Sequence, residues 1–153
     1  MEDINNTSNK EYIELKDIFP QAESIEVLSE GNSEICAKRE SAEFCDIMKA
    51  WLMLMETARQ MPALGVSIDK LTQEEKKSGL WVEFGFEKGV WVWNMNFTAL
   101  LVKICPEYRG FNVMRKIDGK YTGRCYYLDL GEGSMSEFYN FLTGFLAERN
   151  KRD

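Results

Sequence analysis

Between positions 80 and 97, apolar residues recur at every second position on two arms that flank Lys88 and Gly89. Side chains of a strand point alternately to its two faces, so this pattern predicts a β-hairpin with a turn at Lys88-Gly89. In that register one face is apolar, and it carries Leu80, Val82, Phe84, Phe86, Trp91, Trp93, Met95 and Phe97. The other face carries Trp81, Glu83, Gly85, Glu87, Val90, Val92, Asn94 and Asn96. We expect the apolar face to be the core side of a sheet, because a slip of one residue would put it in water.

Two shorter strand pairs are predicted on either side of this hairpin. A three-residue loop from Glu30 to Asn32 would place four apolar residues on one face, namely Ile25, Val27, Ile35 and Ala37. An odd loop around Asp118-Gly119 would likewise gather Phe111, Val113, Tyr121, Cys125 and Tyr127, with Arg115 near Gly123 on that same face. Strands joined by tight turns pair antiparallel, since parallel strands need long crossover connections.

Helical spacing appears in three segments. Tyr12, Leu15 and Ile18 predict a short helix over about 9–18, stopped by Pro20. A long helix capped by Ser41 follows, and Pro62 and Gly65 end it. Its buried stripe is Phe44, Ile47, Met48, Trp51, Leu54, Met55, Ala58 and Met61. Ser134 and Glu137 match a capping box at the start of the last helix, whose buried face runs from Met135 to Leu146.

Two further segments have no clear period. The apolar run 98–105 fits either a short helix or a continuing strand, and we favour the helix. The connector 62–79 is long and is charged in its second half, which favours a solvated excursion with one helical turn.

Together these elements predict an α+β fold. After a short N-terminal helix the order is ββαββ(α)ββα, with an antiparallel sheet of about six strands and helices packed on one face. The 153 residues, 44% of them hydrophobic, fit a single domain spanning 1–153. Residues 1–9 and 150–153 are expected to be disordered, because they are polar and terminal.

The composition excludes several kinds of catalytic and metal-binding site. Histidine is absent, which removes Ser-His and Cys-His catalysis and imidazole metal ligands. The four cysteines lie too far apart in sequence for Cys-x-x-Cys motifs and are expected to be reduced thiols. We therefore expect no metal and no cofactor, and we favour a protein that is not an enzyme.

The expected location is the cytosol. The acidic start, Met1 to Asn6, lacks the basic and apolar regions of a signal peptide. The longest apolar run, 50–55, is far shorter than the roughly 20 residues that span a bilayer. No association with a membrane is expected.

A basic segment stands out from an acidic background. The chain carries a net charge of −6, but residues 103–124 contain six basic and two acidic residues. Candidate contacts to anions or nucleic acid are Arg109, Arg115, Lys116, Lys120 and Arg124. The run from Arg109 begins like the signature of RNA-recognition modules, then departs at Val113 and Met114. We favour a solvated sheet face, because four excess charges on an acidic protein attract nucleic acid weakly.

The tryptophans suggest two kinds of site. Trp51, Trp91 and Trp93 fit core packing, or a ligand pocket between sheet and long helix. Trp81 falls on the second hairpin face with Val90 and Val92. These three residues could form a partner-binding patch, or a second layer could cover them, and both interpretations stay open.

The leading functional hypothesis is a small protein-interaction module, such as an immunity-type inhibitor or a secretion-chaperone-like protein. The alternative is a small-ligand-binding protein or a histidine-free enzyme with a pocket between the sheet and the long helix. The partner, the ligand and the oligomeric state stay open.

Overall fold

The computed structural model describes residues 14–63, 65–92 and 95–152. Side chains of Val92, Met95 and Arg152 fall outside this description, as do residues 1–9, for which disorder was expected. The last helix runs to Arg152, so residues 150–152, also expected to be disordered, are helical.

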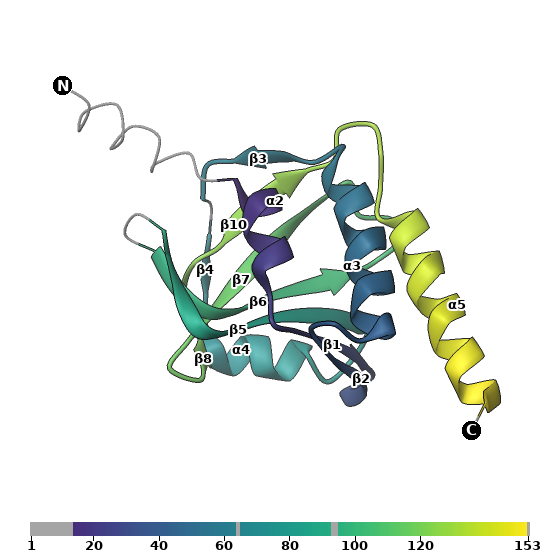
Figure 1. Ribbon diagram of the computed structural model, residues 1–153. Coiled ribbons are helices and arrows are strands. Elements are labelled where there is room, and N and C mark those ends of the chain that lie inside the picture. Colours follow the sequence, from purple (N-terminus) through teal and green to yellow (C-terminus); the bar gives the residue numbers. More distant parts are fainter. Residues whose placement is uncertain (1–13, 64, 93–94, 153) are drawn as a thin grey trace.

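The predicted α+β class is confirmed, with an antiparallel sheet at its centre (Figure 1). The strand order is β2-β1-β5-β6-β7-β10-β3, and β8 pairs with β7. The main strands are β1 Ser24–Ser29, β2 Asn32–Lys38, β3 Arg59–Met61, β5 Leu80–Val92, β6 Met95–Ile104, β7 Gly110–Ile117, β8 Lys120–Tyr121 and β10 Tyr126–Asp129. Two further short strands, β4 Val66–Ser67 and β9 Gly123–Arg124, pair with each other.

Helices cover both faces of this sheet. They are α2 Leu15–Ile18, the 3₁₀ turn Phe19–Gln21, α3 Ala42–Met55, α4 Asp69–Glu75 and α5 Ser136–Arg152. Figure 1 shows α3 and α5 side by side on one face and α4 on the opposite side. We call these the α3 face, which carries Ile25, Phe84 and Val113, and the α4 face, which carries Trp81 and Tyr121. No helix in the described ranges is long and apolar enough to cross a membrane.

The central strand pair does not turn at Lys88-Gly89 as its alternation predicts. β5 continues through these residues to Val92, which pairs with Met95 of β6, and Trp93 and Asn94 lie outside the described residues. Leu80 pairs with Ile104, and the register holds to Gly85. A bulge then shifts it, so that Val90 pairs with Phe97.

The segment 98–105 is strand over 98–104, so the helix we favoured there is wrong. Leu100 and Val102 are buried on the α3 face, and Leu101 is buried on the α4 face. A strand covered on both sides has a continuous apolar run instead of alternation, which by itself does not separate strand from helix.

The turns of the two other strand pairs also differ from the predicted ones. Ile25 pairs with Ala37 and Val27 with Ile35, so the predicted shared face is correct. The loop has two residues rather than three, because Glu30 and Gly31 both take positive φ, as the twist-matched turn requires. A bulge after Val27 restores the register.

The Asp118-Gly119 turn has the same two-residue geometry instead of the odd loop predicted there. Tyr121 consequently lies on the α4 face, and not beside Phe111 and Val113. Tyr126 and Leu128 take the core positions that we had given to Cys125 and Tyr127.

Helix α3 begins as predicted, with the Ser41 hydroxyl accepting a hydrogen bond from the Phe44 amide at 3.1 Å. It ends at Met55 rather than Met61, because Arg59–Met61 forms the edge strand β3 against β10. Tertiary pairing thus overrides the helical spacing of the last turn.

Trp51 of α3 fills the interface between that helix and the sheet. It is 0% exposed, and four phenylalanine rings surround it with centroid distances of 5.1 to 5.8 Å. These rings belong to Phe19, Phe84, Phe111 and Phe138. The predicted core role of Trp51 is confirmed, and side chains occupy the space in which a ligand pocket had been considered.

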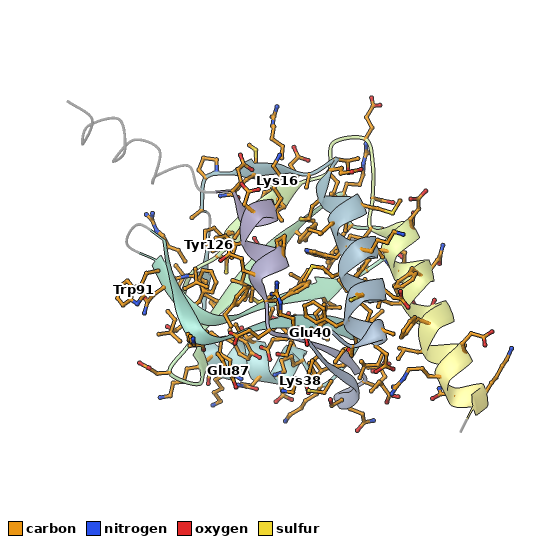
Figure 2. All side chains as sticks on the ribbon, in the orientation of Figure 1. Lys16, Lys38, Glu40, Glu87, Trp91 and Tyr126 are labelled. Carbon is orange, nitrogen blue, oxygen red and sulfur yellow. The ribbon has the colours of Figure 1, made fainter. Side chains whose placement is uncertain are left out.

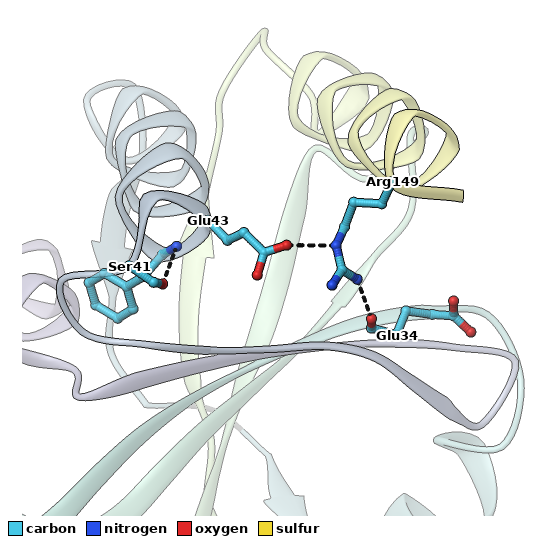
Figure 3. Close-up of polar contacts among 5 residues, drawn as sticks. Glu34, Ser41, Glu43 and Arg149 are labelled. Carbon is cyan, nitrogen blue, oxygen red and sulfur yellow. Dashed lines mark hydrogen bonds and ion pairs between the residues drawn. The ribbon is translucent and has the colours of Figure 1, made fainter. Parts of the chain in front are cut away.

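Helix α5 is capped at its start and joined to α3 near its end (Figure 3). The Ser134 hydroxyl accepts from the Ser136 amide at its start. Near its end, Arg149 pairs with Glu43 of α3 at 2.6 Å and donates to the Glu34 carbonyl of β2. These side chains are about one third exposed, so the ion pair contributes at most about 1 kcal/mol and acts mainly to orient the helix.

Two tryptophans give a matched test of this core. Trp51→Ala should lower the free energy of unfolding by about 3–5 kcal/mol, because it leaves a large cavity. Trp91→Ala should change it by less than about 0.5 kcal/mol, because Trp91 is 77% exposed. Guanidinium denaturation at neutral pH measures both, and a large loss on Trp91→Ala would contradict the register observed here.

Candidate functional site

The α4 face of the sheet has its own small core. Leu28, Trp81, Leu101 and Tyr121 are buried there, and Met114 packs against them. Trp81 is 1% exposed, and its indole nitrogen donates to the Ser78 carbonyl at 2.8 Å. A second layer therefore covers Trp81, which places this candidate docking residue out of reach of a partner.

Tyr121 joins α4 to the sheet through a buried polar network. It is 0% exposed; its hydroxyl donates to the Glu83 carboxylate and accepts from the Lys76 ammonium at 2.8 Å. Its amide donates to Asp69 at the start of α4 at 2.8 Å. The ammonium groups of Lys76 and Lys116 also lie 4.8 and 5.4 Å from its ring centroid.

The burial of this network determines its protonation. Burial, and then the carboxylate of Glu83, raise the pKa of Tyr121, so its hydroxyl stays protonated. A buried carboxylate is tolerated when it is hydrogen-bonded, and the Tyr121 hydroxyl supplies that bond to Glu83. We therefore assign the pair to holding α4 in place.

A cleft of about 250 Å³ opens beside this network. Its buried wall includes Trp81, Cys125 and Ser67, whose hydroxyl lies 3.1 Å from the Cys125 sulfur. Further lining residues are Thr72, Glu75, Lys103, Tyr108, Phe111, Asn112 and Met114. Its rim is apolar and exposed, with Val66 at 68%, Ile68 at 58% and Leu71 at 57%.

Trp91 is the most exposed large hydrophobic side chain in the described part of the chain, at 77%. Figure 2 shows it at the margin of the molecule, on the hairpin arm of β5. The bulge between Gly85 and Val90 removes it from the core face on which alternation had placed it. Val90 is half-buried against the α3-face core, and the side chain of Val92 lies outside the described residues.

The basic candidates do not form one patch. Arg115 is 7% exposed and donates to two backbone carbonyls, and burial lowers its pKa. Lys116 lies over the Tyr121 ring. Arg109 and Lys120 are exposed but flank opposite ends of β7, roughly 25 Å apart at the usual rise per residue. The fifth candidate, Arg124, is exposed on β9.

Arg115 nevertheless brings two exposed features together. Its guanidinium donates to Asn96 and to Arg124, each at 2.9 Å. Asn96 pairs with Trp91 across the hairpin, and Arg124 pairs with Val66. Trp91 and the rim of the cleft therefore occur at the same end of the molecule.

No family model, curated protein or solved structure matches this chain. Within the described ranges there is also no cluster of three or more Cys, Asp or Glu side chains that could hold a metal ion. The surface of the chain and its chemistry are therefore the basis for inferring a function.

Sequence reasoning missed the cleft rim because it treated 62–79 as a solvated connector. A signal is present in that segment: Val66, Ile68 and Leu71 are large apolar residues in a short stretch between Pro62 and the charged run that begins at Gln73. The predicted proximity of Arg115 and Gly123 is correct, since a Cβ at Gly123 would overlap the Arg115 guanidinium.

That overlap predicts that Gly→Ala substitutions at two glycines with positive φ differ in their cost to stability. Gly119→Ala should cost about 1 kcal/mol of stability from backbone strain alone, since open space surrounds it. Gly123→Ala should cost at least about 1 kcal/mol more, because it also displaces Arg115. Equal losses in chemical denaturation would show that Arg115 does not bridge the hairpin and β9.

Two buried tyrosines provide a second comparison. Tyr121→Phe should lower the free energy of unfolding by about 1–3 kcal/mol, because Glu83 loses a donor. The Tyr126 hydroxyl is buried and has no hydrogen-bond partner among the described residues, and burial raises the pKa of Tyr126 to about 12. Tyr126→Phe should therefore leave stability unchanged or raise it by up to about 1 kcal/mol. Similar losses for both variants in denaturation at pH 7 would contradict the network described here.

Proposed function

We propose that this chain is a small protein-interaction module that docks a partner through the end of the molecule carrying Trp91. The single observation behind this proposal is the 77% exposure of that indole. A tryptophan side chain that becomes buried on binding removes roughly 150–250 Å² from water, a gross gain of about 4–6 kcal/mol. Tryptophan is also among the residues most enriched at interface hot spots.

The neighbouring cleft rim supports this choice of surface. Val66, Ile68 and Leu71 add exposed aliphatic area, and Arg115 connects their strand pair to the hairpin. These three residues line one cleft, and exposed apolar residues gathered in this way are typical of a docking surface, whereas single exposed apolar residues are ordinary. Met53 on α3 is 61% exposed and has the buried Met48 and half-buried Leu52 beside it.

The ligand-binding and enzyme alternatives have less support. Trp51 and its phenylalanine neighbours fill the space between the sheet and α3. Hollows of about 450–590 Å³ lie along α3 and α5, whereas the cleft on the α4 face has about 250 Å³, below the roughly 300–1,000 Å³ of small-molecule sites. Its volume suits one side chain of a protein partner better than a substrate.

The proposal includes a cytosolic location. All four cysteines are free thiols, and Cys36 and Cys45 are exposed. Exposed free thiols persist in a reducing compartment. An immunity-type inhibitor and a secretion-chaperone-like module remain the two kinds of interaction protein that we consider within this class.

Tagged protein used as bait in its native lysate tests the proposal. Wild type should retain a protein at near-stoichiometric amounts, and Trp91→Ala should reduce that amount at least about tenfold, the loss expected of an interface hot spot. Met53→Ala is the control, because it removes a comparably exposed side chain from α3. Equal recovery by Trp91→Ala and wild type, measured by quantitative mass spectrometry, would refute docking through this hairpin.

A further inference from the structure

We infer that the cleft on the α4 face binds an acidic peptide segment of a protein partner and encloses one aliphatic side chain of that segment. This inference rests on the proposed function and adds to it the chemistry of the partner. It is carried by the shape of the cleft, its exposed rim and the charges around it.

The apolar part of the site is concentrated in one place. Three of the five exposed large hydrophobic residues in the described ranges line this one cleft, namely Val66, Ile68 and Leu71. They stand at the rim, while Trp81 and Cys125 are buried in the wall. An aliphatic side chain entering the cleft would cover the exposed rim, so apolar area on both partners would leave water together.

The cationic part of the site centres on Lys103. Its ammonium lies 5.7 Å from the Trp81 ring centroid, and it takes part in no ion pair or hydrogen bond with the described residues. Arg124, opposite Val66 across the β4–β9 pair, is exposed, as is Lys70 between Ile68 and Leu71. A carboxylate that reaches Lys103 beside the indole would be partly shielded from water, where an ion pair is stronger than on an open surface.

The nearby carboxylates do not cancel these charges. Glu75 is the one acidic side chain among the described lining residues. Glu74 is paired with Lys77, and Asp69, which accepts a hydrogen bond from the neutral Tyr121 amide, offsets the adjacent Lys70. The remaining excess is therefore positive around the rim.

The overall charge of −6 would suggest a basic partner instead. At physiological salt, however, exposed charges are screened over about 8 Å, so a short peptide responds mainly to its immediate surroundings. Lys103 and Glu75 line the cleft, and Asp69, Lys70 and Arg124 are next to or paired with rim residues, so three basic groups stand against two acidic ones. The local field at the cleft thus favours an acidic segment.

Selection from a random peptide library displayed on phage, with peptides about a dozen residues long, tests this inference without a known partner. Enriched peptides should carry net negative charge and at least one Leu, Ile, Val or Met. The best of them, made synthetically, should bind wild type more weakly as salt is raised. Enrichment of basic or neutral peptides, or no enrichment, would overturn the inference.

Four variants then locate the binding, each checked for folding by circular dichroism. Leu71→Ser and Lys103→Glu should each weaken the peptide at least about tenfold, because each removes a contact made at the cleft. Met53→Ser and Lys49→Glu are their matched controls on α3 and should bind as wild type does. Equal binding by all four variants would place the peptide elsewhere, and peptide-blocked dimerisation in size-exclusion chromatography would assign the cleft to a second copy of this chain.

Different results would refute docking through Trp91 and binding of an acidic peptide at the cleft. Loss of the lysate partner on Trp91→Ala with no acidic preference at the cleft would keep the interaction module and reject this inference. Recovery of that partner by Trp91→Ala would reject the proposed docking hairpin, whatever peptides the cleft selects.

Discussion

The whole structure depends on a sheet that is apolar on both sides. The central strands β5 and β6 bury Phe84 and Leu100 on the α3 face and Trp81 and Leu101 on the α4 face. An antiparallel sheet can leave one face in water only when that face is polar. This chain therefore needs a second covering layer, and the segment between α3 and β5 provides it as β4 and α4.

The second layer is held by polar contacts as much as by apolar packing. Helix α4 has seven residues and would be marginal alone, so its position comes from contacts to the sheet. Tyr121 makes most of them, accepting from Lys76 and donating its amide to Asp69. The same hydroxyl satisfies Glu83, so one side chain both places the helix and allows a carboxylate to be buried beneath it.

The candidate binding surface exists because α4 covers its face of the sheet only in part. Helix α4 hides Trp81 but leaves Val66, Ile68 and Leu71 at the rim of a cleft. The β5 bulge moves the exposed Trp91 to the same end, where Arg115 bridges the hairpin and β9. Apolar side chains that cannot be covered by the chain itself are the physical basis for proposing that another protein covers them.

The sequence by itself determined the α+β class, the Ser41 cap, the buried stripe of α3 and the shared face of Ile25, Val27, Ile35 and Ala37. These follow from side-chain periodicity and local hydrogen bonding, which a single strand or helix expresses on its own. Only the tertiary structure decided that 98–104 is a strand, that Trp81 is buried and that Trp91 is exposed. Each of these depends on what packs on the far side of a strand and on a bulge between distant residues, and periodicity along the chain carries no information about either.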